Sequence, residues 1–233
     1  MKALLLSAGL GTRLRPITDN LPKCLVPIHG KPLMDYWLDG LLCHGIEQVI
    51  VNTHYLSEVV NAYVDSSPWK DSINLVHEPQ LLGTGGTILR NKQYFEDAPF
   101  LVAHADNLTI FDVQSFIQSH LSRRGQVEIT MMTFDTDNPK SCGIVELNAD
   151  GIVIGFHEKV DNPPGIKANA AVYIFDPSVI SYIQSLNKEI VDISTEVLPH
   201  YLGRIGSFHN INYHRDIGTV ESLQLAEIEF PKS

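Results

Sequence analysis

Short apolar runs and amphipathic segments alternate along the first half of the chain. Residues 3–6 form an apolar run too short for a typical helix, which predicts a buried parallel strand. Further strands are expected at 47–52, 73–76 and 100–103. Apolar residues at helical spacing predict the connecting helices, which cover residues 32–45 and 56–64 and begin again near residue 84. The alternation predicts parallel βαβ units and an α/β fold.

A different pattern begins after residue 112. Strands are expected at 127–134 and 206–209, and a hairpin at 143–147 and 152–156. Helices are expected at 112–120, 177–186 and 195–201, and from near Thr219. The change from βαβ units to hairpins predicts a smaller second lobe. We therefore expect one domain over residues 1–233, with a Rossmann-like three-layer α/β/α core and a mixed, mostly parallel sheet.

Composition narrows the choice of partners. The 233 residues include 44% apolar and 19% charged residues, which is ordinary for a globular protein, and the net charge is −10. This charge argues against nucleic-acid binding, because a phosphate backbone needs a basic face. The three cysteines suit neither a disulfide framework nor a zinc site, and are expected to be reduced and buried. With no signal peptide or membrane span recognised in the sequence, we expect a cytoplasmic protein.

The loop after the first strand carries the main candidate chemistry. Gly9 and Gly11 allow a ligand to approach backbone N–H groups, and Arg13 and Lys23 supply cations suited to phosphate oxygens. Leu14 stands where a dinucleotide fingerprint needs a small residue, and no Walker A sequence is present. The loop therefore favours a polyphosphate ligand, although the glycines alone would also fit a surface turn.

The complete string around this loop is more specific than its glycines. The sequence G-x-G-T-R-L-x-P-x-T, followed by P-K and V-P-I-x-G-K-P-L, resembles the signature of the sugar nucleotidyltransferases. These enzymes join a nucleoside triphosphate to a sugar 1-phosphate. The resemblance implies that Arg13 and Lys23 act on the triphosphate as catalytic residues. It also implies a nucleotide site that includes Leu6, Ala8, Gly9, Gly11 and Thr12.

A second glycine-bearing segment, H-E-P-Q-L-L-G-T-G-G-T, begins at His77. The resemblance implies that residues 82–86, Gly83 among them, enclose the base and ribose. A strand-to-helix connection with no ligand is the alternative. The carboxylate of Glu78 can accept from the two adjacent donors of guanine, so Glu78 favours guanine if it faces the base. A solvated carboxylate at the strand end is again the alternative.

Two aspartates are candidate metal ligands. Asp106 follows the strand at 100–103, at the sheet edge where ligands of α/β folds bind, and a carboxylate there could hold Mg²⁺ over a triphosphate. Asp216 stands in D-I-G-T, the last signature string, and resembles the family's second metal-binding aspartate. The resemblance therefore implies Mg²⁺ as the cofactor. His104-Ala105 before Asp106 departs from the family's usual glycine.

The resemblance also covers the sugar phosphate. Glu158 and Lys159 match the first two residues of the family's Glu-Lys-Pro motif, with Val160 in place of the proline, although an adjacent Glu-Lys pair can also be solvated charge. Gly143 and Asn169 resemble further sugar-site positions. Ala171 stands where glycine is common and could narrow the pocket.

The similarity is greatest to mannose 1-phosphate guanylyltransferase-like members of the family. We expect a Mg²⁺-assisted enzyme that uses GTP and mannose 1-phosphate, or a related hexose or heptose 1-phosphate, and releases pyrophosphate. The alternatives are a UTP- or dTTP-dependent enzyme and a non-catalytic regulator that binds nucleotide sugars. The sequence indicates neither the oligomeric state nor a C-terminal β-helix domain.

Overall fold

The computed structural model describes residues 1–231 and divides into two compact units, which we treat separately. The first unit combines Met1–Leu81, Ala103–Phe111 and Asn212–Ser233. The second combines Leu82–Val102 and Asp112–Ile211. Each unit therefore packs together stretches that are far apart in the sequence.

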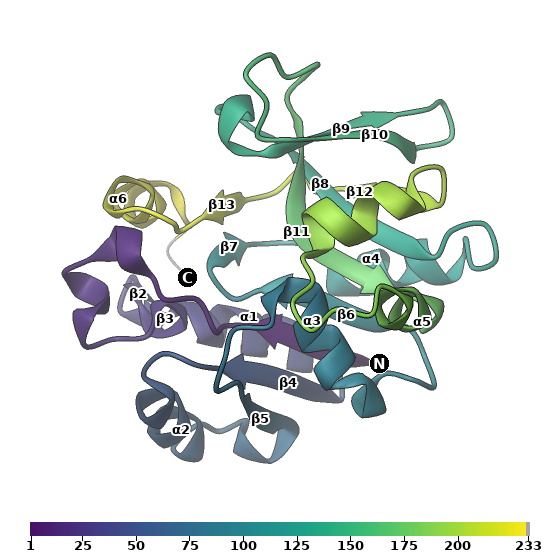
Figure 1. The fold of residues 1–233 in the computed structure, drawn as a ribbon. Helices are drawn as coiled ribbons and strands as arrows, with labels where there is room; N and C mark the ends of the chain where they lie inside the picture. The colour runs from purple at the N-terminus through teal and green to yellow at the C-terminus, as the bar shows by residue number, and fades with distance from the viewer. Residues whose placement is uncertain (232–233) are drawn as a thin grey trace. The chain divides into compact units, whose positions relative to one another are not determined.

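A parallel sheet forms the centre of the first unit. Its strands are β1 (Lys2–Leu6), β4 (Gln48–Thr53) and β5 (Ile73–His77), in the order β5-β4-β1 (Figure 1). Helices α1 (Leu33–Leu42) and α2 (Ser57–Asp65) make the crossovers between these strands. The carboxyl ends of the three strands therefore meet at one edge, as the βαβ pattern predicts.

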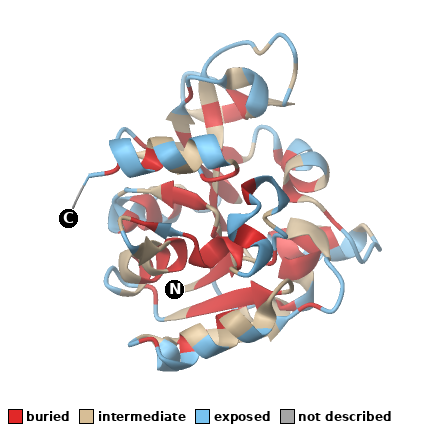
Figure 2. Cartoon of the chain, turned by 90° about the vertical axis from the view of Figure 1, so that its left-hand side faces the viewer, coloured by how far each residue is buried: buried red, intermediate tan, exposed pale blue. Residues whose placement is uncertain are grey.

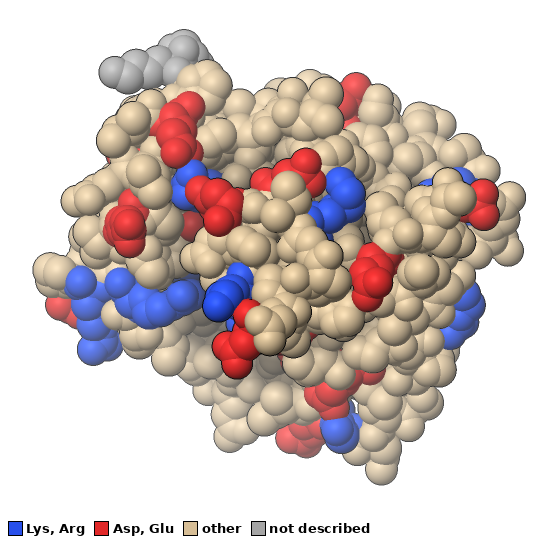
Figure 3. Space-filling model, turned by 90° about the horizontal axis from the view of Figure 1, so that it is seen from above, with Lys and Arg blue, Asp and Glu red and all other residues tan. Residues whose placement is uncertain are grey.

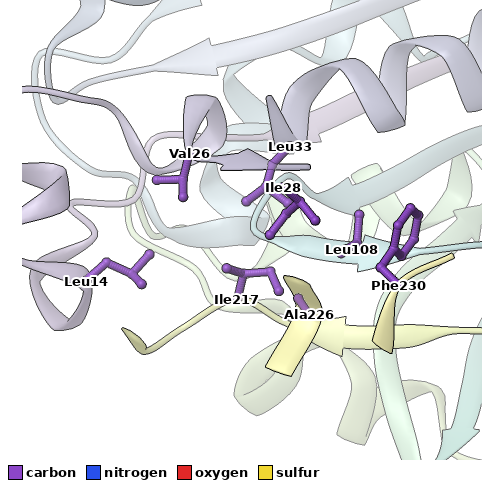
Figure 4. Close-up of a cluster of buried hydrophobic side chains, with 8 residues drawn as sticks. All are labelled: Leu14, Val26, Ile28, Leu33, Leu108, Ile217, Ala226 and Phe230. Atoms are coloured by element: carbon purple, nitrogen blue, oxygen red, sulfur yellow. The ribbon is translucent and has the colours of Figure 1, made fainter. Parts of the chain in front are cut away.

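Two short antiparallel ribbons and a helix complete the first unit. The ribbons are β2 (Pro27–Ile28) with β3 (Lys31–Pro32), and β7 (Asn107–Thr109) with β13 (His214–Asp216). Helix α6 covers Val220–Glu229. Buried side chains from these elements, from the start of α1 and from the loop after β1 form one cluster, drawn in Figure 4: Leu14, Val26, Ile28, Leu33, Leu108, Ile217, Ala226 and Phe230. The cluster fixes the loop and both ribbons to one apolar core.

A mixed sheet forms the centre of the second unit. Its strands are β8 (Ile129–Asp135), β9 (Gly143–Leu147), β10 (Ile152–Glu158), β11 (Lys167–Phe175) and β12 (Ile205–His209). Their order is β11-β8-β12-β10-β9, with β9 also pairing with β11. The β12–β8 pair is parallel, whereas β8–β11 and β9–β10 are antiparallel. The helices of this unit are α3 (Gly83–Arg90), α4 (Val113–Leu121) and α5 (Ser178–Ser185).

Strand β6 (Phe100–His104) contributes residues 100–102 to the second unit and residues 103–104 to the first. Strands β1, β4, β6, β8 and β11 are mostly buried, and buried residues are drawn in red in Figure 2. Short 3₁₀ helices cover Thr12–Leu14 (η1), Ile17–Asp19 (η2), Lys23–Leu25 (η3), Lys70–Ser72 (η4), Lys92–Tyr94 (η5) and Pro139–Ser141 (η6). The predicted α/β class with a mixed sheet is confirmed; the prediction of a single domain stays a prediction.

One predicted helix has a different form. At 195–201 the chain makes a π-helical turn, η7 (Ile193–Val197), followed by a 3₁₀ turn, η8 (Leu198–Tyr201). Pro199 lacks the N–H that an α-helix needs, which explains the break in the α-helical hydrogen bonding. Of the cysteines, Cys24 is buried, Cys142 is partly exposed and Cys43 is exposed, and all three are free. The expectation of buried thiols therefore holds for Cys24 alone.

The surface carries charges of both signs. Acidic and basic side chains lie among one another on the face drawn in Figure 3. Among residues 1–231, no helix is long and apolar enough to cross a membrane.

Candidate functional site

The loop after β1 turns sharply at Gly11. Gly11 has a φ of +63°, a left-handed conformation that costs other residues about 1–2 kcal/mol. A Cβ there would lie 2.9 Å from Thr18 Cγ2, and Thr18 Oγ1 donates a 2.7 Å hydrogen bond to Gly11 O. At Gly9, no heavy atom of the described chain lies within 4 Å of a built Cβ. Gly11 therefore shapes the loop, whereas Gly9 leaves its surface open to a ligand.

Lys23 is buried beside two carboxylates. Its Nζ lies 2.5 Å from Asp106 Oδ2 and 3.7 Å from Asp216 Oδ1. The Lys23 side chain is 9% exposed, whereas that of Asp216 is 57% exposed. A buried ammonium group is costly unless it is paired, so the two carboxylates offset the cost of burying Lys23.

The β7–β13 ribbon brings the two aspartates together. Asp106 immediately precedes β7, and Asp216 ends β13 and pairs with Asn107. Ile217 N donates a 2.9 Å hydrogen bond to Asp106 O, and Trp37 Nε1 donates a 2.8 Å hydrogen bond to Asn107 O. The backbone therefore holds both carboxylates beside the Lys23 ammonium.

The two carboxylates differ in acidity. Burial raises the pKa of Asp106, but neighbouring Lys23 and His104 outweigh it and hold the pKa below its ordinary value. Burial and the charge of Asp106 raise the pKa of Asp216 above its ordinary value, although Lys23 and Arg13 oppose this shift. An additional cation beside the pair would favour the ionised form of both groups.

Gly218 makes room for Arg13 beside Asp216. A Cβ on Gly218 would lie 2.8 Å from Asp216 Oδ2 and 3.0 Å from Arg13 Nη2. The guanidinium and the carboxylate therefore approach the same backbone position. Gly218 had no predicted role, although it is part of the recognised string D-I-G-T. That string was the sequence signal that could have identified it.

The predicted base-reading residue is buried rather than solvated. Glu78 follows β5 and is 3% exposed. Asn52 Nδ2 donates a 3.0 Å hydrogen bond to Glu78 Oε1, and His54 Nδ1 lies 2.7 Å from Glu78 O. Asn52, which is 2% exposed, had no predicted role. The sequence offered no signal for such a role, because Asn52 is a single polar residue near the end of a strand.

Asp106 and Asp216 can hold a divalent cation together, because both already contact one cationic group. Mg²⁺ is commonly bound by one or two carboxylates, substrate phosphates and water. Among residues 1–231, no group of three or more His, Cys, Asp or Glu side chains could hold a metal ion. The pair therefore fits a metal that binds with a phosphate ligand better than one held by a cage of protein groups.

In the second unit, the β9–β10 hairpin gathers three of the predicted sugar-site residues. Gly143 pairs with Glu158, and a Cβ on Gly143 would lie 2.6 Å from Glu158 Oε2. Lys159 Nζ lies 3.2 Å from Glu158 Oε1, and the Lys159 side chain is 65% exposed. Lys159 also has a φ of +50°, a strained conformation that is enriched at ligand sites.

Asn169 holds an irregularity of β11 in place. Its Oδ1 accepts a 2.9 Å hydrogen bond from Ala171 N, and its Nδ2 donates a 2.6 Å hydrogen bond to Tyr173 Oη. The register with β8 shifts between Asn169 and Tyr173, and Ala171 has a φ of +53°. Asn169 therefore has a structural role that the sequence did not indicate.

The glycines of L-G-T-G-G face the backbone of residues 189–191. A Cβ would lie 2.5 Å from Val191 O at Gly83, and 2.4 Å from Glu189 O at Gly86. Gly85 N donates a 2.8 Å hydrogen bond to Val191 O. Close packing accounts for these glycines without a ligand, and nucleotide binding by Gly83 stays a prediction.

The first unit contains the predicted nucleotide and metal residues except Gly83: Leu6, Ala8, Gly9, Gly11, Thr12, Arg13, Lys23, Glu78, Asp106 and Asp216. The second unit contains Gly83 and the predicted sugar-site residues: Gly143, Glu158, Lys159 and Asn169. The roles of all these residues stay predictions.

Solved structures share this fold. A putative glucose-1-phosphate thymidylyltransferase from Bacillus anthracis, in complex with a sucrose, matches with a TM-score of 0.86 at 21% identity, over 100% of this chain and 97% of that chain. HddC from Yersinia pseudotuberculosis, complexed with GMP-PN, matches with a TM-score of 0.79 at 26% identity, over 99% of each chain. The chain therefore shares its α/β fold with these two solved structures.

The nucleotidyl transferase family model matches residues 2–232, and the chain belongs to that family. It is 32% identical to mannose-1-phosphate guanylyltransferase of Mycobacterium tuberculosis, over 95% of this chain and 62% of that protein. It is 30% identical to UTP--glucose-1-phosphate uridylyltransferase of Synechocystis, over 91% of this chain and 58% of that protein. The chain thus spans about three fifths of the length of these curated relatives.

Proposed function

We propose that this chain is a sugar 1-phosphate nucleotidyltransferase that uses GTP and releases pyrophosphate. The observation that carries the proposal is the cluster of Lys23, Asp106 and Asp216 in the first unit, where one buried ammonium group lies against two carboxylates. Arg13 lies beside the same cluster at Gly218. Such a combination of cations and metal-binding carboxylates suits a triphosphate.

The proposed reaction is an in-line displacement at phosphorus. A phosphate oxygen of the sugar 1-phosphate forms a bond to the α-phosphorus of GTP. The bond from that phosphorus to the bridging oxygen breaks, and pyrophosphate leaves with the bonding electrons. Since the attacking oxygen is already anionic near neutral pH, no general base is required. The main obstacle is repulsion between two anions, so catalysis depends on positioning and electrostatics.

The charged residues of the candidate site each have a part in this reaction. Arg13 and Lys23 spread their positive charge over the triphosphate, and Lys159 carries the phosphate of the sugar. Asp106 and Asp216 would hold Mg²⁺, which supplies positive charge at the reacting phosphates when bound. Lys23 would then exchange part of its contact with the carboxylates for phosphate oxygens.

The choice of GTP depends on Glu78. A buried carboxylate can accept hydrogen bonds from both guanine N1–H and the 2-amino group, whereas uracil and thymine present one donor between two acceptors. The relatives named mannose-1-phosphate guanylyltransferases support the same base and suggest mannose 1-phosphate, or a related hexose or heptose 1-phosphate, as the sugar. The uridylyltransferase relative favours the second candidate, a UTP- or dTTP-dependent enzyme.

Pyrophosphate release tests the proposal. The purified chain is incubated with Mg²⁺, each of the four nucleoside triphosphates and dTTP, against a panel that includes mannose, glucose and heptose 1-phosphates. Fastest turnover with GTP supports the guanylyl assignment, and fastest turnover with UTP or dTTP replaces it with the second candidate. Binding of GTP without pyrophosphate release from any pair would indicate a non-catalytic regulator.

A further inference from the structure

Asn52 joins the phosphate loop to the carboxylate proposed to read the base. It lies at the carboxyl end of β4, between Leu6 of β1 and Val76 of β5 in the parallel register. Its side chain therefore lies where the loops after β1 and β5 begin. Both Asn52 and Glu78 are almost completely buried, at 2% and 3% exposed.

The two polar atoms of the Asn52 side chain serve different partners. Its Nδ2 donates a 3.0 Å hydrogen bond to Glu78 Oε1. Its Oδ1 accepts a 2.7 Å hydrogen bond from Ser7 N, in the first residue of the loop. Ser7 Oγ also donates to the backbone oxygen of Asn52. The amide group thus fixes the Glu78 carboxylate and the start of the phosphate loop at the same time.

We propose that Asn52 is a positioning residue that aims the Glu78 carboxylate at the base and keeps it in register with the phosphate loop. The inference rests on the proposed function, because it takes Glu78 as the base-reading group. Asn52 itself need not touch the nucleotide. Its contribution is to Glu78: it binds one carboxylate oxygen and so fixes the direction in which the carboxylate can accept further hydrogen bonds.

The chemistry at this position calls for an amide. A carboxylate accepts but cannot donate, so Glu78 needs a donor, whereas Ser7 N–H needs an acceptor. An asparagine side chain provides both. Aspartate would keep the bond from Ser7 N but place a second carboxylate against Glu78, which forces one group to turn away or to share a proton. Leucine would remove both bonds at similar volume.

A comparison of GTP with ITP, whose bases are guanine and hypoxanthine, measures how well the Glu78 carboxylate is aimed at the base. Both bases present N1–H, but hypoxanthine lacks the 2-amino group, so a well-aimed carboxylate binds GTP more tightly than ITP. A hydrogen bond to a charged group contributes about 1.5–3 kcal/mol, which corresponds to a preference of roughly 10- to 100-fold. If Asn52 aims the carboxylate, its replacement should reduce this preference rather than weaken both ligands equally.

The experiment measures dissociation constants for GTP and ITP by calorimetry, without sugar phosphate, for the wild-type chain and Asn52→Asp. We expect the GTP-over-ITP preference to fall at least about fivefold in the variant, mainly through weaker GTP binding. Asn52→Leu should lose the preference as well and should also bind inorganic triphosphate more weakly, because the loop loses its anchor at Ser7. This second variant keeps the test available if Asn52→Asp does not fold.

Asn74→Asp is the matched control. It makes the same chemical change on neighbouring β5, where the Cα partner of Asn74 is Ile50. The control should keep the wild-type preference. Thermal unfolding of each variant gives the folded fraction used in the binding analysis.

Two outcomes would overturn the role of Asn52. One is a folded Asn52→Asp variant that keeps its GTP-over-ITP preference within about twofold; the other is an equal weakening of both nucleotides, which a purely structural role would produce. The wild-type chain alone tests the proposed base. If it prefers UTP, the guanine assignment fails, and the role of Asn52 is judged on whether Asn52→Asp reduces the preference for UTP over GTP.

Discussion

The first unit gathers charged side chains from distant parts of its chain, whereas the predicted sugar-site residues of the second unit contact near neighbours in the sequence. In the first, Lys23 contacts Asp106 and Asp216, which a ribbon of two strands far apart in the sequence holds together. In the second, Asn169 binds residues two and four positions further along the same strand. The first arrangement has no evident purpose for folding alone, since burying charge is costly.

The difference separates two kinds of motif residue. A buried ammonium group between carboxylates is a candidate ligand site, because an apolar core would cost less free energy to build. Glycines and amides in a signature can serve the backbone and a ligand together. Mutations can therefore distinguish the two kinds. Replacing a residue that serves a ligand should change activity without stability, and replacing one that serves the backbone should change stability.

The largest effect is expected at the charged cluster. Lys23→Met should lower kcat/KM for nucleotidyl transfer at least about 100-fold, the scale of losing one electrostatic stabiliser. The measurement is initial-rate pyrophosphate release. Lys92→Met makes the same change at the Lys92–Glu96 pair in the second unit and should stay within about twofold. Near-normal turnover by Lys23→Met would break the assignment of the cluster.

How much of this site the sequence could predict depends on the type of signal. Arg13, Lys23, Asp106 and Asp216 stand in strings specific enough to be recognised, and the structure brings all four into one unit. The ribbon that joins Asp106 to Asp216 was missed, because three-residue strands show no periodicity. Neither element pattern nor motif could predict that the pair would face Lys23.

The contacts of the remaining residues could not be predicted, because they depend on which groups the fold buries beside them. Asn52 is an ordinary polar residue in the sequence, and its role depends on register with two other strands. The glycines at 83–86 fit the same string whether they meet a nucleotide or the backbone of residues 189–191. The strands and helices of the first βαβ units follow local periodicity and lie close to their predicted ranges, whereas strand β11 (Lys167–Phe175) was not predicted.

Packing in the second unit gives the next prediction. In Gly86→Ala, the new Cβ would lie 2.4 Å from Glu189 O, so we expect the free energy of unfolding to fall by about 1–3 kcal/mol. Urea denaturation measures the change. Gly40→Ala in α1, where the described chain leaves 4 Å of open space, should instead stabilise by about 0.5–1 kcal/mol. A raised KM for nucleotide with unchanged stability would assign Gly86 to the ligand.

Acid should destabilise the second unit through His120. This residue is fully buried, with Nδ1 2.9 Å from Thr130 Oγ1 and Nε2 3.6 Å from Asp176 Oδ1. Burial lowers its pKa; Asp176 opposes the shift only in part, and Arg124 adds to it. Below the ordinary histidine pKa of about 6.5, His120 is protonated in the unfolded chain but stays neutral in the folded chain. The free energy of unfolding therefore decreases as pH falls.

His120→Asn should remove this dependence. Between about pH 6.5 and 5 the wild-type chain should lose up to about 1.4 kcal/mol more per pH unit than the variant. Urea unfolding of both chains across that range isolates the histidine, because the carboxylates titrate in each. Parallel stability curves for the two chains would contradict the buried, neutral imidazole.

The smallest effect is expected at Ala171, where the family commonly has glycine. Its φ of +53° costs an alanine about 1–2 kcal/mol, and glycine recovers this strain but loses about 0.5–1 kcal/mol of chain entropy on folding. Ala171→Gly should therefore stabilise by about 0.5–1 kcal/mol, whereas Ala170→Gly, one residue away without a positive φ, should destabilise. Opposite signs in urea denaturation would show that the family's glycine relieves backbone strain at the Asn169 bulge. Equal destabilisation by both variants would contradict the left-handed conformation of Ala171. The glycine of the family at this position would then be explained by the space it leaves in the sugar pocket rather than by backbone strain.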